Sequence, residues 1–360
     1  MAALYELHAP ALSALYGDLE NFARRQGLAL PGTPGSVLER TNASGFRFYA
    51  HQYYDANGRK VEKYLAGPVG DPAADARAKD LGERIAELNA AIRNVRLLGR
   101  EGFKLADAKT YATIASLHNH ALFEAGAVLV GSHAYGVLLN QLGARAAQYA
   151  TQDVDIARNA ELALAKRPQK SFLEIIKDSG IAFVEIPQLN KRKPSTSFKE
   201  AGNSFFQVDL LVPSATDEIR TVRVPELGAH ATALPHLKYL LAETQESVLL
   251  AREGCCPVRV PAPERFALHK LLVSQLRRQR GEKSVKDLSQ ASVLLAILAE
   301  RHSGAIEQAA KAVPASARKR LAAASAVARA QLQSHPRAIE ALDAFAGQGE
   351  GTRRPSGTSR

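Results

Sequence analysis

The sequence predicts an α+β (mixed α/β) protein, in which a small mixed β-sheet core with helices follows an N-terminal helix and hairpin and precedes a C-terminal helical region. Residues 105–215 alternate between helical and extended apolar patterns, which is typical of such a core. An Asn-Gly pair near residue 57 separates two β-rich runs, and the chain after residue 216 has mainly helical spacing. We expect four parts: 1–100, 101–215, 216–346 and a disordered Gly/Ser/Arg-rich tail at 347–360.

The N-terminal part is predicted to contain a helix, a hairpin and a long helix. Phe46 to Tyr49 and Lys60 to Tyr64 are the expected hairpin strands, because Asn57-Gly58 supplies the positive φ angles of a tight turn. Residues 73–98 space leucine and isoleucine as a helix does. Aromatic and basic side chains share the hairpin. This mixture fits a nucleic-acid stacking surface, and it equally fits a partly buried hairpin with a polar outer face.

The composition is that of a globular chain that can bury a core, with 46% hydrophobic and 23% charged residues. We expect no membrane span, since no run of 18 apolar residues occurs, and no signal peptide. Neighbouring Cys255 and Cys256 are poorly placed for a structural disulfide, which favours a reducing, cytoplasmic setting. A net charge of +11 favours anionic partners such as nucleotides or nucleic acid, although high arginine usage also produces it.

The elements of the core follow in order along the chain. A helix near 108–124 should lead to a buried strand at 127–130, and a second helix follows Gly131-Ser132. We then expect a strand from Val154 to Ala157, a helix near 171–178, and strands near 181–186 and 204–212. A hairpin near 247–260 and further helices complete the prediction.

Gly131-Ser132 ends a buried strand and begins a helix. Gly131 permits close approach of a phosphate, and Ser132 with the free amides of the helix start can hold phosphate oxygens. Alone, the same turn is explained by a serine N-cap.

Three acids accompany this turn. Residues two apart in a strand share a side, so Asp153 and Asp155 project together. Two such carboxylates repel unless a cation lies between them, and magnesium prefers hard oxygen ligands. Asp209 lies in an apolar strand, where a lone acid needs a partner, and the same metal site would provide one. The alternative is that all three acids simply face water.

Together, the turn, the Asp-x-Asp strand and the later Asp strand resemble the polymerase-β-like nucleotidyltransferase superfamily. More narrowly, VGSHAYGVLL, TQDVDIA, QVDLLVPS and VRVPAPERFALHKLLVSQLRRQ with KSVKDLSQA resemble a bacterial nucleotidyltransferase-like domain family, over roughly residues 105–300. One departure is that 20 residues separate Ser132 from Asp153, more than is usual in the superfamily. We expect this length to extend the helix and add a loop around 143–148.

The resemblance implies a magnesium-dependent enzyme that binds a nucleoside triphosphate. Asp153, Asp155 and Asp209 would bind two Mg²⁺ ions and act in catalysis, while Gly131, Ser132 and Lys270 would bind the nucleotide. A pairing with Asp287 explains Lys270 equally well.

Other basic and titratable side chains have two interpretations. The basic residues at 277–286, among them Lys283 and Lys286, fit either a polynucleotide backbone or a solvated helix end. His133 and His269 are best explained by local polar contacts, since no Ser/His/Asp or Cys/His arrangement accompanies them.

The leading hypothesis is transfer of a nucleoside monophosphate to RNA, with transfer RNA as the first acceptor to test. The basic charge and the resemblance to toxin-type nucleotidyltransferases support it. The alternatives are adenylylation of a protein or a small hydroxyl compound by the same site, and a catalytically silent nucleotide- or RNA-binding module. The sequence identifies neither a protein partner nor the base of the triphosphate.

Overall fold

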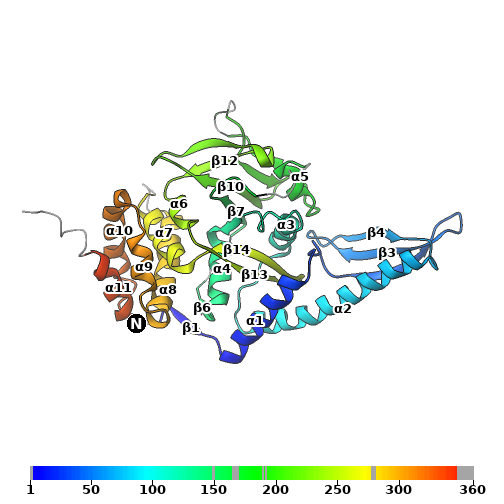
Figure 1. Ribbon diagram of the computed structural model, residues 1–360, viewed down its shortest axis with the longest axis horizontal. Helices are drawn as coiled ribbons and strands as arrows, with labels where there is room; N and C mark the ends of the chain where they lie inside the picture. The colour runs from blue at the N-terminus through cyan, green and yellow to red at the C-terminus, as the bar shows by residue number, and fades with distance from the viewer. Residues whose placement is uncertain are drawn as a thin grey trace, which may run out of the picture.

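The computed structural model describes residues 3–147, 151–163, 170–188, 190, 193–276 and 281–346. A mixed sheet occupies the centre, the N-terminal sheet and its long helix project to one side, and the last helices lie on the opposite side (Figure 1). The predicted α+β architecture is confirmed. The predicted tail at 347–360 lies outside the described residues. Within the described ranges, no helix is both long and apolar enough to span a membrane.

The N-terminal part contains two more strands than the predicted hairpin. Its elements are β1 (Tyr5–Leu7), α1 (Pro10–Arg25), β2 (Ser36–Thr41), β3 (Arg47–Tyr54), β4 (Lys60–Ala66) and α2 (Pro72–Arg100). β2, β3 and β4 form one antiparallel sheet in that order. The expected hairpin is β3–β4, and the expected long helix is α2.

The β3–β4 connection is longer than the tight turn predicted from Asn57-Gly58. Tyr54 pairs with Lys60, so residues 55–59 form the loop. Asp55 Oδ1 accepts hydrogen bonds from the backbone N–H groups of residues 57 and 59, each at 2.9 Å. Gly58 has a φ of 73°. The Asp55 carboxylate therefore closes a wider loop that needs positive φ at the glycine only.

The central sheet has the strand order β11-β12-β10-β7-β5, with β9 also on β10 and β8 on β9. Its elements are α3 (Ala108–Asn119), β5 (Ala127–Val130), α4 (Gly131–Gln141), β7 (Asp153–Arg158), α5 (Phe172–Lys177), β8 (Phe183–Glu185), β9 (Ser197–Glu200), β10 (Gln207–Pro213), β11 (Arg220–Val224) and β12 (Ala229–Leu234). β5 is antiparallel to β7, whereas β10 and β7 are parallel. The sheet is mixed, as predicted.

Helix α3 ends earlier than the predicted residue 124. Ala121 has a φ of 57°, which is a left-handed conformation. The Leu122 N–H donates to the Leu117 carbonyl and the Ala121 N–H to the His118 carbonyl. This is the hydrogen-bond pattern of a Schellman motif, which ends a helix and turns the chain. The turn directs the chain into β5.

The segment between α4 and β7 contains a strand where a loop was expected. β6 (Ala144–Ala146) pairs antiparallel with β1, so that Tyr5 lies opposite Ala146. The N-terminus is thereby fixed to the central part of the protein.

The C-terminal part combines a hairpin with helices. Its elements are a 3₁₀ turn (Pro225–Leu227), α6 (Leu237–Leu240), β13 (Thr244–Ala251), β14 (Gly254–Pro261), α7 (Pro263–Leu276), α8 (Glu282–Arg301), α9 (Ala305–Lys311), α10 (Ala315–Ala328) and α11 (Pro336–Ala346). The β13–β14 hairpin was predicted, whereas β11 and β12 extend the central sheet into a region expected to be mainly helical.

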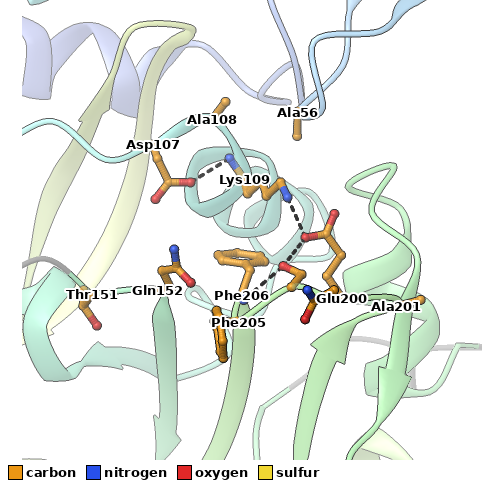
Figure 2. A pocket seen from close by; sticks show the side chains of 12 residues that line it. Ala56, Asp107, Ala108, Lys109, Thr151, Gln152, Glu200, Ala201, Phe205 and Phe206 are labelled. Carbon is orange, nitrogen blue, oxygen red and sulfur yellow. Dashed lines mark hydrogen bonds and ion pairs between the residues drawn. The ribbon is translucent and has the colours of Figure 1, made fainter.

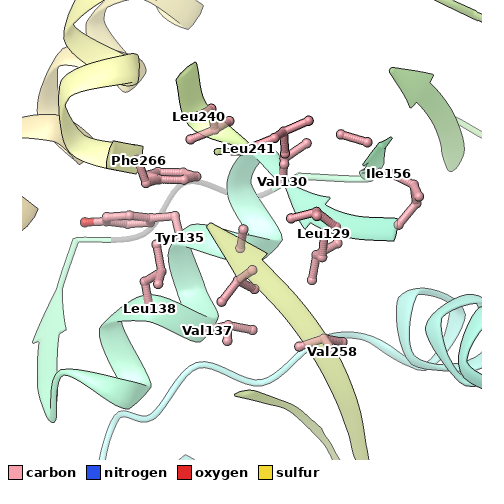
Figure 3. Close-up of a cluster of buried hydrophobic side chains, with 14 of the residues drawn as sticks. Leu129, Val130, Tyr135, Val137, Leu138, Ile156, Leu240, Leu241, Val258 and Phe266 are labelled. Carbon is pink, nitrogen blue, oxygen red and sulfur yellow. The ribbon is translucent and has the colours of Figure 1, made fainter. Parts of the chain in front are cut away.

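A buried apolar cluster joins the sheet to α4 and α7. Leu129 and Ile156 of the sheet lie in the same core as Tyr135 of α4 and Phe266 of α7 (Figure 3). The rings of Tyr135 and Phe266 are 6.5 Å apart between centroids and nearly parallel. Close packing of this kind permits little movement. It holds the start of α4 in a defined position relative to β7.

Candidate active site

The three predicted aspartates lie on two adjacent strands. β7 and β10 pair in register, with Asp155 opposite Asp209 and Asp153 opposite Gln207. Val154, between Asp153 and Asp155, and Ile156, after them, are buried, so the two acids share the other side of β7. Residues opposite each other in paired strands point to the same side of a sheet. The structure therefore brings Asp209 beside Asp155, with Asp153 next along the strand.

The Gly131 bend lies against Asp155. Val130, the last residue of β5, pairs with Asp155, and Gly131 follows with a φ of 68°. A Cβ atom built on Gly131 would lie 1.9 Å from Asp155 Oδ2. Glycine is thus required here twice, by its left-handed conformation and by the closeness of the carboxylate.

The N-terminus of α4 opens next to these acids. The N-cap residue Val130 has no side-chain oxygen that could accept the first amides of the helix. Ser132 is the second residue of α4 and stands directly after the bend. Unsatisfied amides and the helix dipole favour an anion at this position.

Burial and mutual repulsion raise the pKa values of Asp155 and Asp209. Burial, with the charge of Asp209 next in importance, raises the pKa of Asp155 to about 7. Burial also raises the pKa of Asp209, with a further contribution from the Asp153 charge, although hydrogen bonds from Ser197 and Gln207 oppose this rise. Like charges in a low-dielectric site produce such shifts, and a bound cation would relieve them.

The donor set fits magnesium in its chemistry. Three carboxylates supply hard oxygen atoms, and the two with raised pKa values would gain most from a neighbouring cation. In the part of the chain that the structure describes, no three His, Cys, Asp or Glu side chains already surround one point as metal ligands do. A bound ion would therefore require small rotations of these side chains.

Lys270 is held by an ion pair rather than directed freely at the acids. Its Nζ atom lies 2.7 Å from Asp287 Oδ1, and the two side chains are 12% and 4% exposed. This is the pairing that the sequence offered as an alternative. Lys270 nevertheless lies near enough to lower the pKa of Asp155. Its positive charge is therefore part of the site.

Two further lysines approach the acids from the start of α8. Lys283 lowers the pKa values of Asp155 and Asp209. Burial, followed by the charge of Lys270, lowers the pKa of Lys286, which is also influenced by Asp153 and Asp155. In the sequence these lysines belonged to a basic run, of which residues 277–280 lie outside the described ranges. Their position near the acids follows from the packing of α8 on α7.

His269 is buried and His133 is partly buried. His133 Nε2 lies 3.4 Å from Thr110 Oγ1, which is the local polar contact expected for it. Burial lowers the pKa of His133 to about 4 and that of His269 to about 3. Neither value suits proton transfer near neutral pH.

A pocket of about 820 Å³ opens at the edge of the sheet where β7 and β10 begin. The residues that form it come from the start of α3, the segment before β7 and the β9–β10 turn, and they include Asp107, Lys109, Gln152, Glu200, Phe205 and Phe206 (Figure 2). Lys109 Nζ reaches Glu200 Oε2 at 2.5 Å across it. Sequence reasoning did not identify this pocket. The alternation Phe205, Gln207, Asp209 was the one signal that could have placed Phe205 on the side of the acids.

One comparison with known proteins found a match. Residues 108–314 match a family model described as nucleotidyltransferase, and this range begins at α3 and includes both aspartate strands and the lysines of α7 and α8. Searches of curated proteins and of solved structures found no match. Since the matched range covers more than half of the chain, the protein belongs to this nucleotidyltransferase family.

Proposed function

We propose that the protein is a magnesium-dependent enzyme that transfers a nucleoside monophosphate from a nucleoside triphosphate to a hydroxyl group of RNA, with release of pyrophosphate. One observation carries most of the weight. The carboxylate of Asp155 lies between its strand partner Asp209 and Gly131, the first residue of α4. It lies so close to Gly131 that it leaves no room there for a Cβ atom. Carboxylates and open helix amides at one point suit a reaction on a magnesium-bound phosphate.

Each residue has a proposed role. Asp153, Asp155 and Asp209 would hold two magnesium ions, which when bound neutralise charge on the phosphate oxygens. The amides after Gly131, with Ser132, would orient the triphosphate. Lys270, Lys283 and Lys286 would add positive charge on the same side, since the first two act on Asp155.

Asp209 is the proposed acceptor of the proton from the attacking hydroxyl. Asp209 lies opposite Asp155 on the neighbouring strand, so its carboxylate would be close to a hydroxyl group that approaches the bound phosphate. The hydroxyl oxygen would form a bond to the α-phosphorus while the bond from this phosphorus to the bridging oxygen of pyrophosphate breaks.

RNA is the proposed acceptor because the chain has a net charge of +11. Transfer RNA is the first RNA to test, and a protein or a small hydroxyl compound would be served by the same chemistry. Buried, free Cys255 and Cys256 are in keeping with the cytoplasmic setting that we propose.

The test is incubation of the purified protein with each α-³²P-labelled triphosphate, magnesium, and total RNA or total protein. We expect label in RNA, loss of labelling in the Asp153→Asn/Asp155→Asn variant, and a far-ultraviolet circular dichroism spectrum unchanged by the substitutions. Label in the protein fraction alone would identify the other acceptor class. If the folded variant labels RNA to the same extent as the wild type, the catalytic assignment of these aspartates is contradicted. The catalytically silent binding module would then be the remaining hypothesis.

A further inference from the structure

The pocket beside the acids is the part of the site that the roles above do not use. It adjoins Asp153, because Gln152 directly precedes this acid, and Phe206 lies three residues before Asp209. The backbone N–H of Gln207 donates to the carbonyl of Gln152 at 3.1 Å, which fixes the two strand starts together. A ligand in this pocket would therefore border the acids at the ends of both strands.

Phe205 is the feature of this pocket that points to its ligand. Its side chain is 81% exposed, whereas neighbouring Phe206 is 4% exposed and packs against Phe183 with ring centroids 5.8 Å apart. Phe206, Val208 and Leu210 are buried, so alternation places Phe205 on the side of Asp209. At about 3.3 Å per residue, the Cα atoms of Phe205 and Asp209 are roughly 13 Å apart. A free aromatic face at this position can stack a nucleobase.

The opposite wall of the pocket is fixed and electrically balanced. Glu200 accepts hydrogen bonds from Lys109 Nζ and from Ser204 Oγ, each at 2.5 Å. This joins the start of α3 to the β9–β10 turn, and Figure 2 shows the pair above the two phenylalanines. Asp107 caps α3 at the same pocket. Balanced charge and an extra acid suit a neutral base better than a triphosphate.

The strand order separates the two reactants. The Gly131 bend lies on the β5 side of β7, whereas Phe205, two residues before β10, and Glu200, the last residue of β9, lie on the other side. Lys270, which acts on Asp155, comes from α7 and is no part of the pocket lining. In an in-line displacement the attacking and leaving oxygens lie on opposite sides of the phosphorus. The triphosphate then belongs with the bend, and the acceptor with the pocket.

We propose that this pocket binds the 3′-terminal nucleoside of the RNA acceptor, with its base stacked on Phe205. The inference rests on the function proposed above and specifies its acceptor. The 3′-hydroxyl oxygen of that nucleoside forms the new bond to the α-phosphorus, its proton passes to Asp209, and the bond to pyrophosphate breaks. Because every base has a stacking face, the terminal base of the acceptor is bound with little preference for its identity.

The test compares substitutions at Phe205 with one at another exposed apolar side chain. Phe205→Ala and Phe205→Leu remove the aromatic face, Phe205→Trp keeps it, and Ile219→Ala is the control because Ile219 is 68% exposed and lies outside the pocket lining. Binding of a 5′-fluorescein oligoribonucleotide is measured by anisotropy without magnesium, beside the same oligonucleotide with an abasic 3′-terminal residue. KM values for RNA and for the triphosphate are measured with magnesium.

We expect Phe205→Ala and Phe205→Leu to weaken RNA binding and raise the KM for RNA by roughly 5- to 150-fold, which corresponds to the loss of one stacked base. Phe205→Trp and Ile219→Ala should stay within about twofold of the wild type, by the same reasoning. The wild type should bind the abasic oligonucleotide more weakly than the intact one by the same factor. Phe205→Ala should bind the two oligonucleotides equally. The KM for the triphosphate should not change.

Other results would overturn the inference. These are failure of the wild type to bind the oligonucleotide, equal binding by wild type and Phe205→Ala, and an effect of Phe205→Ala on the triphosphate KM alone. Labelling of protein and not RNA would do the same. A wild type that binds RNA through Phe205 but transfers no nucleotide would refute the proposed function and leave the pocket assignment intact.

Discussion

Replacing Gly131 by alanine tests the geometry of the site at one atom. The new Cβ would lie 1.9 Å from Asp155 Oδ2, so the carboxylate must rotate away. A left-handed conformation costs a residue other than glycine about 1–2 kcal/mol. Moving the Asp155 side chain off its preferred rotamer adds on the order of 1 kcal/mol. We therefore expect Gly131→Ala to destabilise the protein by about 2–3 kcal/mol in total.

Gly27→Ala is a matched control for the backbone term. Gly27 has a φ of 66°, against 68° for Gly131, and a Cβ on Gly27 would meet no atom within 4 Å. Gly27→Ala should lose only the stability that the left-handed backbone conformation costs, about 1–2 kcal/mol. The difference between the two variants then measures the contact with Asp155. Urea unfolding monitored by circular dichroism gives both values from the midpoint and slope.

Activity should separate the two variants more strongly than stability does. Displacement of a reacting group by about 1 Å reduces a rate on the order of 100-fold. Gly131→Ala should therefore lose nucleotidyl transfer by at least that factor, whereas Gly27→Ala should keep the activity of the wild type. Equal stability losses in the two variants, together with full transfer by Gly131→Ala, would show that the carboxylate does not lie against this glycine.

Three further substitutions probe the charges around the site. Lys270→Ala should lower the free energy of unfolding in urea by about 3–5 kcal/mol, because the nearly buried Asp287 carboxylate lies 2.7 Å from the Lys270 ammonium group. A Lys270→Met/Asp287→Leu variant should recover most of this stability. No recovery would contradict a buried ion pair. Burial, followed by the Lys270 charge, lowers the pKa of His269 to about 3 in the folded protein. His269 is therefore protonated at a higher pH in the unfolded chain than in the folded protein, and stability should fall as pH drops from about 6.5 towards 3. His269→Gln should reduce that slope, and an unchanged slope would refute the buried neutral histidine. Asp155→Asn removes the repulsion between Asp155 and Asp209, so it should raise Tm at pH 8 without divalent ions. It should also abolish the rise in Tm that we expect magnesium to cause in the wild type. An equal magnesium response in both proteins would exclude Asp155 as a ligand.

Local patterns were sufficient for the elements that lie closest to the acids. Strand 127–130 was predicted to the residue, because four apolar residues end at a glycine that begins a helix. The pairing of β7 with β10 was inferred from chemistry, since a lone acid in an apolar strand needs a partner. Both inferences depend on residues that are near in sequence or alike in chemistry.

Elements fixed by distant contacts could not be found this way. β1 and β6 are three residues each and pair across more than 130 residues of chain, so neither has a pattern of its own. β12 alternates buried and half-buried side chains, but its buried positions are alanines, which favour strands poorly. Helix α3 was predicted too long because no glycine marks its end, where Ala121 takes the left-handed position.

The lysines show the same limit within the site. The sequence left Lys270 with two interpretations, a phosphate contact or a pair with Asp287, and grouped Lys283 and Lys286 with a basic run. The packing of α8 on α7 pairs Lys270 with Asp287 and brings the other two lysines near the acids. Spacing along one helix cannot predict which residues the next helix brings alongside it.

The mixed strand direction explains why the Gly-Ser turn and the acids meet at all. Asp153 and Asp155 stand at the start of β7, so a partner strand must end there to place its following helix beside them. β5 does so because it is antiparallel to β7, with Val130 opposite Asp155. Had β5 run parallel, its last residue would lie near Arg158, roughly 10 Å along the strand from Asp155 at about 3.3 Å per residue. The amides at the start of α4 would then be out of reach of a phosphate bound at the acids, so the direction of β5 is as necessary to the site as the three carboxylates.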